Sequence, residues 1–565
     1  MTDQGFTPWS FLMRLILLAT VAALAACSGP APAGPAESGR ITVFTNGLIY
    51  TGLEDPATVD GVVVGADGRI IATIPPMSAD WGDDEGELNI IDLGGAVMFP
   101  GFTDAHAHLL GIGQRELTLN LEGTASIDEL ITRTEIELTE KAPGEILFGR
   151  GWIETGWPDG RMPSAEDLDM VSPDNPVIFV RADGHALVAN TLALKAAGIY
   201  DETPDPAGGH VERSADGKAT GIVIDNAMTP VMKLVAEPSE ADLLKAYETG
   251  AKTYAARGWT GAHNMSVDPA HATLLERLDR EGRLPLRLYN AFGEAGMELA
   301  SKRLHETDTI TNRAVKLYMD GALGSRGAQL LAPYADRPES VGLSLLDDDR
   351  LAALMAQAKA ANVQLAIHAI GDLANRRILE AFETGGYGPA ERWRIEHAQV
   401  LAPEDIDRVA RSGLIPSMQP SHAIGDLFFA PARLGMERLR GAYAWASLIR
   451  AGAIIAGGSD APVEVGSPLI EFYAAVARKD LSGFSGEGWH PEEALSRRQA
   501  LMLFTYWPAY AAFQEEDLGT IEPGKIADFT VFDRDLMTVP EGEILKARAL
   551  MTVIGGEIVW QAPSE

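Results

Sequence analysis

Strand-like and helix-like segments alternate through most of this 565-residue chain. Helical patterns such as 239–257 and 349–361 lie between short apolar runs, as a parallel sheet with crossover helices requires. The runs that qualify as strands end at 106–108, 260–263, 286–289, 315–318, 365–368, 394–397, 415–418 and 454–460. Eight such units fit an α/β fold of the TIM type, a (β/α)8 barrel with its active site at the carboxyl ends of the strands.

Residue types that bind metals stand at several of these strand ends. The first strand leads into His106-Ala107-His108, and residues two apart on a strand project to the same side, so both imidazoles can reach one ion. An isolated pair of this kind is more often two polar residues where a strand leaves the core. Here further ligand-type residues end later strands, namely Lys316, His368, His397 and Asp460. The ordered set favours a metal-dependent hydrolase.

The chain is strongly acidic, with a formal net charge of -34. Binding to a phosphate backbone requires clustered Lys and Arg, so the composition argues against a nucleic-acid partner. Acidity of this kind otherwise concerns solubility and does not identify a substrate. The hydrophobic content of 46% is typical of a globular protein with a substantial core.

The N-terminus has the pattern of a targeting signal. Residues 12–26 are apolar but too short to span a bilayer, and Leu24-Ala25-Ala26-Cys27-Ser28 resembles the lipobox of bacterial lipoproteins. In such proteins Cys27 would be acylated and become the first mature residue, which predicts a signal peptide over 1–26, started at Met1 or Met13. The alternative is a plain secretory signal with an incidental cysteine.

The Pro- and Ala-rich segment after Cys27 predicts a lipidated tether over 27–39. The expected location is the bacterial cell envelope, on a membrane facing the periplasm, most simply the outer membrane, with the lipid as the sole membrane contact. Cys27 is also the only cysteine, which excludes internal disulfides, a cysteine zinc ligand and a cysteine nucleophile.

Both ends of the remaining chain have the texture of short strands and turns. Hairpin signals of the Asn-Gly and Asp-Gly type occur in 40–98, and 517–565 has a similar pattern. These two segments predict one small β-sandwich domain built from both chain ends around a barrel at 99–516. The stretch from about 118 to 238 is too long for one connection and predicts an inserted subdomain over the barrel mouth.

In order and spacing, the ligand-type residues match the amidohydrolase superfamily. Further motifs resemble its amidohydrolase-3 branch, which includes proteins similar to N-substituted formamide deformylase. These motifs are Gly149-Arg150-Gly151-Trp152, Asp183-Gly184-His185, Asp320-Gly321-Ala322-Leu323-Gly324-Ser325-Arg326, His368-Ala369-Ile370-Gly371-Asp372, Ile395-Glu396-His397-Ala398-Gln399, Gly458-Ser459-Asp460-Ala461-Pro462 and Gly519-Thr520-Ile521-Glu522-Pro523-Gly524-Lys525-Ile526-Ala527-Asp528.

The resemblance implies a centre with two divalent ions, most simply zinc. It implies that Lys316, carboxylated by carbon dioxide, bridges the ions, that His368 and His397 hold the second one, and that Asp460 binds metal and moves a proton. The residues alone leave other readings open. Lys316 could face either way on its strand, a single histidine at a strand end is more often hydrogen-bonded in the core, and Asp460 could cap a helix.

The implied reaction is attack of a metal-activated hydroxide on a carbonyl, with Asp460 passing the proton to the leaving nitrogen. The expected substrate is a small amide, formamide or N-acyl compound, and a homodimer is compatible with the sequence. The alternatives are hydrolysis of a cyclic amide, a carbamate or an ester on the same metal core, or a catalytically silent binding lipoprotein. Loss of a ligand would indicate silence, and all six ligand-type residues are present.

Four residues resemble positions that line the substrate pocket in this branch, namely Trp152, His185, Arg326 and His422. A core aromatic residue is an equal reading for Trp152, and a plain loop residue is an alternative for His185. Trp152 is followed by Ile153-Glu154, where many relatives have Asp-Gln, which puts any contact made there in doubt.

Overall fold

The computed structural model describes residues 41–563, apart from 56, 76–87, 155–156, 183, 185, 207–208 and 487–488. The predicted signal peptide, Cys27 and the tether therefore lie outside the described residues, as does His185. In the part that is described, no helix has the length and apolar character needed to cross a membrane.

Within the described chain, eight parallel strands form the central sheet, and their order in space follows their order in sequence. They are β6 (Phe102–Ala107), β13 (Trp259–Val267), β14 (Arg287–Phe292), β15 (Ile310–Tyr318), β16 (Gln364–Ala369), β17 (Arg394–His397), β18 (Ile415–Met418) and β19 (Ala456–Gly457). The backbone amide of Asp460, just after β19, donates to the carbonyl of His106 at 2.7 Å and so joins the last strand to the first. The predicted TIM-type barrel is confirmed.

Helices between the strands cover the barrel, and their ends carry the expected signals. α7 (Glu240–Arg257) begins with a capping box between Ser239 and Asp242 and ends at Gly258, whose φ of 100° suits a residue without a Cβ. α10 (Asp348–Ala361) begins after the side-chain cap of Asp347.

The other helices of the barrel region are α2 (Leu109–Glu116), α8 (Ala272–Arg280), α9 (Met297–Lys302), α11 (Asp372–Thr384), α12 (Pro403–Ser412), α13 (Pro420–Asp426), α14 (Ala430–Leu434), α15 (Trp445–Arg450), α16 (Pro468–Ala477), α17 (Arg497–Phe504) and α18 (Tyr506–Ala511).

Both ends of the chain enter one mixed sheet. Its strands are β1 (Ile41–Tyr50), β2 (Thr58–Val64), β3 (Ile70–Ile74), β4 (Leu88–Asp92), β5 (Val97–Pro100), β20 (Phe529–Phe532), β21 (Ala549–Ile554) and β22 (Glu557–Gln561). β1 pairs with β2 on one edge and with β4 and then β5 on the other, so all these strands belong to a single hydrogen-bonded sheet. The prediction that both ends build one β unit agrees with this pairing, whereas a sandwich of two sheets is not confirmed.

Aromatic side chains join this sheet to the barrel. Phe102, at the start of β6, is fully buried and lies 5.7 Å from the ring of Phe532 and 6.3 Å from that of Phe504. Burying such a ring stabilises the fold by about 1.5–3 kcal/mol. The first barrel strand is thereby anchored at its amino end.

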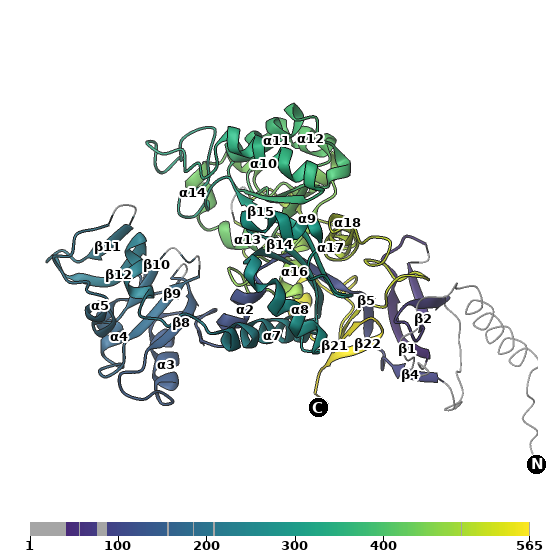
Figure 1. Cartoon of the computed structure of the whole chain (residues 1–565), viewed down its shortest axis with the longest axis horizontal. Helices are drawn as coiled ribbons and strands as arrows, with labels where there is room; N and C mark the ends of the chain where they lie inside the picture. Colours follow the sequence, from purple (N-terminus) through teal and green to yellow (C-terminus); the bar gives the residue numbers. More distant parts are fainter. Residues whose placement is uncertain are drawn as a thin grey trace, which may run out of the picture.

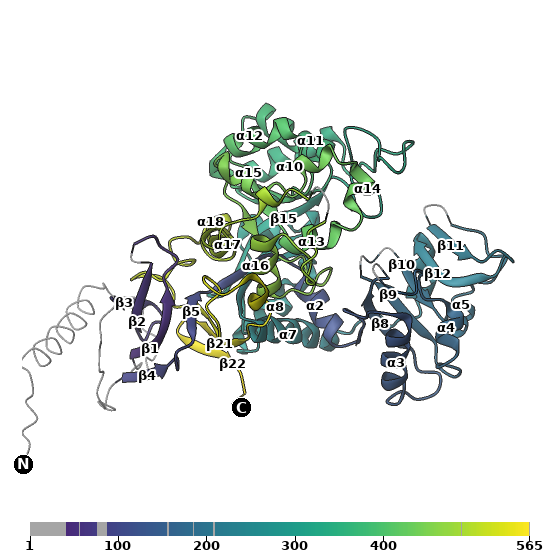
Figure 2. The same ribbon diagram turned by 180° about the vertical axis from the view of Figure 1, so that it is seen from behind.

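The segment after α2 forms a separate lobe with its own sheet and apolar clusters. Its strands and helices are β7 (Leu119–Asn120), α3 (Ile127–Leu138), β8 (Leu147–Trp152), α4 (Ala165–Asp169), β9 (Val177–Arg181), β10 (Ala186–Ala189), α5 (Thr191–Ala196), β11 (Gly209–Arg213), β12 (Ala219–Asp225) and α6 (Thr229–Met232). All of them fall within the predicted insert. The lobe lies on the side of the barrel that carries α2, α13 and α14 (Figures 1 and 2), and α2 contacts its strands β7 and β8.

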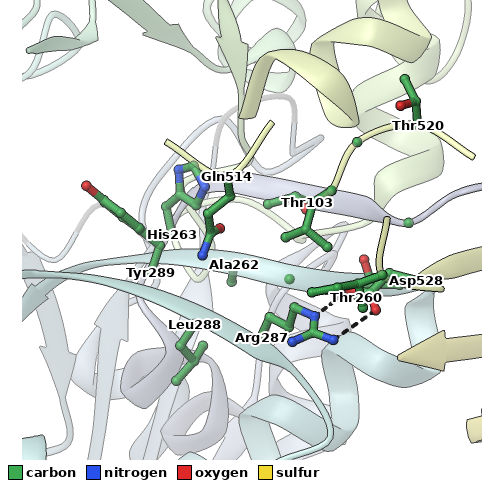
Figure 3. Close-up of a pocket in the computed structure, with 15 residues that line it drawn as sticks. Thr103, Thr260, Ala262, His263, Arg287, Leu288, Tyr289, Gln514, Thr520 and Asp528 are labelled. Carbon is green, nitrogen blue, oxygen red and sulfur yellow. Dashed lines mark hydrogen bonds and ion pairs between the residues drawn. The ribbon is translucent and has the colours of Figure 1, made fainter. Parts of the chain in front are cut away.

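A pocket lies where the amino ends of the barrel strands meet the mixed sheet (Figure 3). Gly101, Thr260 and Arg287 line it from the barrel side, and Asp528 lines it from the other. Arg287 Nε donates to Asp528 Oδ2 at 2.5 Å. No residue that the sequence predicts for the functional site lines this pocket, so the predicted site lies elsewhere on the barrel.

Candidate metal centre

The carboxyl end of β6 is fixed to the segment after β19 by one buried carboxylate. Asp104 Oδ1 accepts from the amides of His106 at 3.0 Å and Ser459 at 2.9 Å. Its Oδ2 accepts from the hydroxyls of Ser459 at 2.6 Å and Tyr254 at 3.0 Å. Burial raises the pKa of Asp104 to about 6. Asp104 therefore holds together the two segments that carry His106, His108 and Asp460.

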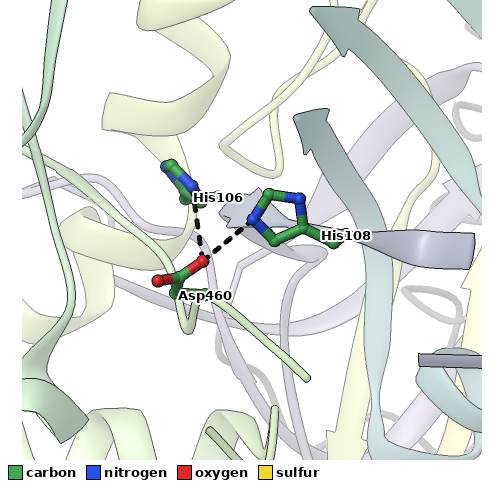
Figure 4. Close-up of side chains that lie close together, drawn as sticks. All are labelled: His106, His108 and Asp460. Atoms are coloured by element: carbon green, nitrogen blue, oxygen red, sulfur yellow. Dashed lines mark hydrogen bonds and ion pairs between the residues drawn. The ribbon is translucent and has the colours of Figure 1, made fainter. Parts of the chain in front are cut away.

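Asp460 faces His106 on β6 and His108 directly after it (Figure 4). Its Oδ1 lies 3.0 Å from His108 Nε2 and 3.4 Å from His106 Nε2. Asp460 adopts a φ of 61°, a left-handed conformation rare for residues other than glycine, at the sharp turn after β19. Burial raises the pKa of Asp460, but the nearby His106 and His108 lower it by a larger amount, so the net pKa lies well below the usual value.

Hydrogen bonds at Nδ1 fix which nitrogen of each ring points to the centre. His108 Nδ1 lies 3.1 Å from the carbonyl oxygen of Met265, which can only accept, so Nδ1 carries the proton. His108 Nε2 then presents a lone pair to Asp460 Oδ1. Two acceptors 3.0 Å apart repel each other unless a cation, either a proton or a metal ion, lies between them. This contact fits a metal ligand pair.

His106 is held by residues that the sequence reasoning did not single out. Its Nδ1 lies 2.5 Å from Glu396 Oε2, and Glu396 Oε1 in turn lies 2.7 Å from Arg394 Nε. Burial raises the pKa of Glu396, but Arg394 and His106 lower it to a net value below the usual range. An ionised partner at Nδ1 orients a metal-binding imidazole and raises its basicity. Two charged residues two positions apart, directly before His397, were the available signal in the sequence.

Lys316 on β15 lies inside the barrel against His106. Its Nζ is 3.4 Å from His106 Nε2, and its side chain is almost fully buried. Burial lowers the pKa of Lys316 to about 8. A neutral amine is the form that reacts with carbon dioxide, so this environment favours the carboxylation that the resemblance implies.

His397 lies next to the rings of both His106 and His368. The ring centroids are 4.8 Å and 4.5 Å apart respectively. His397 Nδ1 lies 2.8 Å from Gln419 Oε1, which accepts a hydrogen bond, so Nδ1 carries the proton. His397 Nε2 then has a free lone pair that can bind a metal ion. His368 Nε2 is buried without a hydrogen-bond partner, 3.6 Å from Asp320 Oδ1.

Burial keeps these imidazoles neutral. Together with nearby Lys316, it lowers the pKa of His106 to about 4 and that of His368 to about 3. A neutral imidazole is the form that binds a metal ion. Zinc or a similar divalent ion is bound by imidazole nitrogens and carboxylate oxygens, and some of the imidazole nitrogens here are buried without a hydrogen-bond partner. These residues therefore fit a divalent metal ion.

The residues predicted to contact substrate fall in different places. Trp152 is fully buried in the inserted lobe, where its indole N–H donates to the carbonyl of Phe179 at 2.9 Å, so it lies in the core of the lobe. Arg326 lies in the loop after β15 and pairs with Asp336 at 2.8 Å. His422, on α13, is 3.5 Å from Asp460 Oδ2. Of the three described residues, His422 is the one placed beside the metal-ligand candidates.

Comparison with known proteins gives the same picture over nearly the whole described chain. A family model described as an amidohydrolase family matches residues 89–560. The Bacillus subtilis protein YtcJ is 33% identical over 533 residues, which cover 92% of this chain and 99% of YtcJ. The N-substituted formamide deformylase of Arthrobacter pascens is 28% identical over 495 residues, which cover 84% of this chain and 90% of that enzyme.

A solved structure shows the same architecture. An uncharacterised metal-dependent hydrolase of Pyrococcus horikoshii superposes with a TM-score of 0.72 at 29% sequence identity, covering 89% of this chain and 99% of the other. A second uncharacterised metal-dependent hydrolase, from Pyrococcus furiosus, gives a TM-score of 0.70 at 28% identity, covering 88% and 100% of the two chains.

Proposed function

Because this chain belongs to the amidohydrolase family, we propose that it is a metal-dependent hydrolase of a C–N bond in a small amide, formamide or N-acyl compound. The observation that carries the proposal is the pair of His108 Nε2 and Asp460 Oδ1, two acceptor atoms 3.0 Å apart that require a cation. The similarity to N-substituted formamide deformylase supports the choice of bond.

The proposed ligands are His106, His108, Lys316, His368, His397 and Asp460. We assign His106, His108 and Asp460 to one divalent ion, His368 and His397 to a second, and carboxylated Lys316 to the bridge between them. Zinc suits these donors best. When bound, the ions would polarise a carbonyl oxygen and lower the pKa of water to about 7.

The residues of the chain position the substrate and move the proton. Asp460 projects from the turn after β19 into the mouth of the barrel and is proposed to take the proton at a carboxylate oxygen and pass it to the departing nitrogen. Glu396 and Gln419 hold His106 and His397 in fixed orientations through their Nδ1 atoms. Arg326 and His185 stay proposals for substrate contacts, whereas Trp152 lies in the core of the inserted lobe.

A substrate screen on metal-analysed protein tests this function. The purified chain is expected to carry divalent metal, to hydrolyse some N-formyl or N-acyl compounds, and to lose that activity on treatment with a chelator and regain it with zinc. Hydrolysis of esters, carbamates or cyclic amides without any open-chain amide would show that the proposed bond is wrong. Metal-free protein that hydrolyses none of these compounds after zinc is added would support a silent binding protein.

We also propose that acylated Cys27 anchors the protein to a bacterial envelope membrane facing the periplasm. The lipobox-like sequence and the tether support this, and several acyl chains anchor firmly because each buried methylene adds about 0.8 kcal/mol. Cell fractionation of wild type and Cys27→Ser tests it: the variant should move to the soluble fraction. Equal solubility of both would contradict the anchor. A homodimer is likewise a proposal, checked by sedimentation of the soluble domain.

A further inference from the structure

His422 lies in the first turn of α13, directly after β18, with an orphaned nitrogen. Its Nε2 is buried and has no hydrogen-bond partner. The nearest carboxylate atoms are Asp460 Oδ2 at 3.5 Å and Glu464 Oε1 at 3.9 Å. A buried polar atom without a partner costs free energy, so it indicates a site where a ligand or ion completes the contacts.

The separation between His422 and Asp460 decides between two kinds of contact. At 3.5 Å, His422 Nε2 and Asp460 Oδ2 are too far apart for a good hydrogen bond, which is about 2.7–3.2 Å long. Two ligand atoms of one zinc ion, each about 2.0–2.2 Å from it, lie about 2.8–3.8 Å apart at ligand–zinc–ligand angles of about 90–120°. The observed separation fits two ligands of one ion.

Asp460 offers one oxygen to each of two groups of histidines. Its Oδ1 faces His106 and His108, and its Oδ2 faces His422. One ligand atom each from His397, His422 and Asp460 lie within 4.8 Å of one another, and the same holds for His106, His108 and Asp460. The ring of His422 stacks on that of His397, with centroids 5.8 Å apart.

We propose that His422 is a metal ligand, which together with His397 and Asp460 Oδ2 holds the second divalent ion of the centre. This inference rests on the proposed function and adds a donor to the six named there. It replaces the role in substrate binding that the sequence suggested for His422. Asp460 then contacts both ions, one through each oxygen, in addition to the Lys316 bridge.

Cobalt substitution tests the ligand directly. Metal-free wild type, His422→Ala and His422→Cys are titrated with Co²⁺, and bound cobalt and absorption are recorded. Wild type should bind two ions per chain, whereas His422→Ala should bind the second ion roughly 100-fold more weakly. Loss of a residue that only supports a ligand lowers metal affinity by about 10- to 100-fold, so the expected loss lies at the upper end of that range. His422→Cys should recover the second ion and show a thiolate-to-cobalt charge-transfer band.

Two controls accompany the titration. Cys27 is the only cysteine of the wild type, so the wild type reports any band that does not come from position 422. His305→Ala removes a histidine paired with Glu276 on the outside of the barrel and should leave both ions bound.

Two results would overturn the inference. If wild type binds two ions, His422→Ala binds both with unchanged affinity and His422→Cys shows no charge-transfer band, then His422 is not a ligand while the proposed function stands. If wild type itself binds no cobalt, the proposed function fails together with this inference. Should His422→Ala not fold, the band of His422→Cys decides alone.

Discussion

Two buried histidine nitrogens without hydrogen-bond partners at the carboxyl end of the barrel contrast with paired polar groups at its amino end. At the amino end, Arg287 and Asp528 satisfy each other, and the Gln364 amide both accepts from Tyr289 and donates to backbone carbonyls. At the carboxyl end, the Nε2 atoms of His368 and His422 are buried without partners. A fully hydrogen-bonded network stabilises a fold. Buried polar atoms without partners cost stability and are retained where a ligand binds to them.

Two of the proposed metal ligands at the carboxyl end have an unusual backbone conformation. His397 at the end of β17 and Asp460 in the turn after β19 have φ values of 75° and 61°, a conformation that residues with a Cβ adopt at a cost. The anchored ring of Phe102 and the Arg287–Asp528 pair stabilise the opposite end. The comparison indicates that one end holds the fold together and that the other is built for chemistry, as is usual in barrels of this type.

The largest effect is expected at the carboxyl end, from Asp460→Asn. The amide side chain keeps the shape and one oxygen ligand but cannot take up a proton. Turnover of an amide should fall about 100- to 10,000-fold, measured by steady-state kinetics, and that of an ester with a good leaving group should fall less. Near-normal amide turnover with the metals still bound would show that another residue carries the proton.

Arg287→Ala at the amino end should weaken the fold but not the metal centre. Arg287 and Asp528 are largely buried, and removal of one partner leaves the other charge unpaired, which costs about 3 kcal/mol or more. Denaturant unfolding measures the loss, and bound metal per chain should not change. Arg277→Ala, which breaks an exposed pair with Glu240, is the matched control and should cost less than about 1 kcal/mol. Metal loss in folded Arg287→Ala would break the proposed division between the ends.

Lys316→Ala tests the bridge between the proposed ions. The variant should bind the second ion about 100-fold more weakly, and short carboxylic acids should restore part of the activity by replacing the carbamate. Metal analysis and kinetics with and without such acids provide the measurement. Full activity with two metals per chain would exclude a bridging role for Lys316.

The smallest effect is expected from Gln419→Ala, which touches the centre only through His397. Loss of the acceptor at Nδ1 frees the imidazole to rotate, so metal affinity should fall about 10-fold. Equilibrium titration measures the change, and Gln419→Glu should retain the affinity because a carboxylate also accepts from Nδ1. Equal affinity in Gln419→Ala and wild type would show that the orientation of His397 is fixed by packing.

The barrel could be predicted from sequence because its strands are apolar runs separated by capped helices. β15 ends at Tyr318, the residue expected from the pattern, and β16 ends at Ala369, one residue beyond the expected His368. Ligand-type residues were recognisable for the same reason, since the carboxyl ends of parallel strands converge whatever lies between them. For the barrel and its ligand-type residues, the local sequence pattern and the overall topology therefore agree.

The supporting contacts could not be predicted in the same way. Glu396 is far from His106 in sequence, and Gln419 reaches His397 from a neighbouring strand end, so their roles depend on barrel geometry. The position of His422 beside Asp460 likewise follows from where α13 begins. Local hairpin signals also could not show that both chain ends join one sheet. That arrangement depends on the pairing of β1 with three other strands, which is a long-range property.

The most direct test of the account is anomalous X-ray diffraction at the zinc edge from crystals of the zinc-loaded protein. The account predicts two peaks at the carboxyl end of the barrel, one among His106, His108 and Asp460 and one beside His397. It predicts no peak in the amino-end pocket beside Arg287 and Asp528. Zinc-loaded crystals without a peak at the carboxyl end, or with zinc bound at the amino end instead, would contradict it.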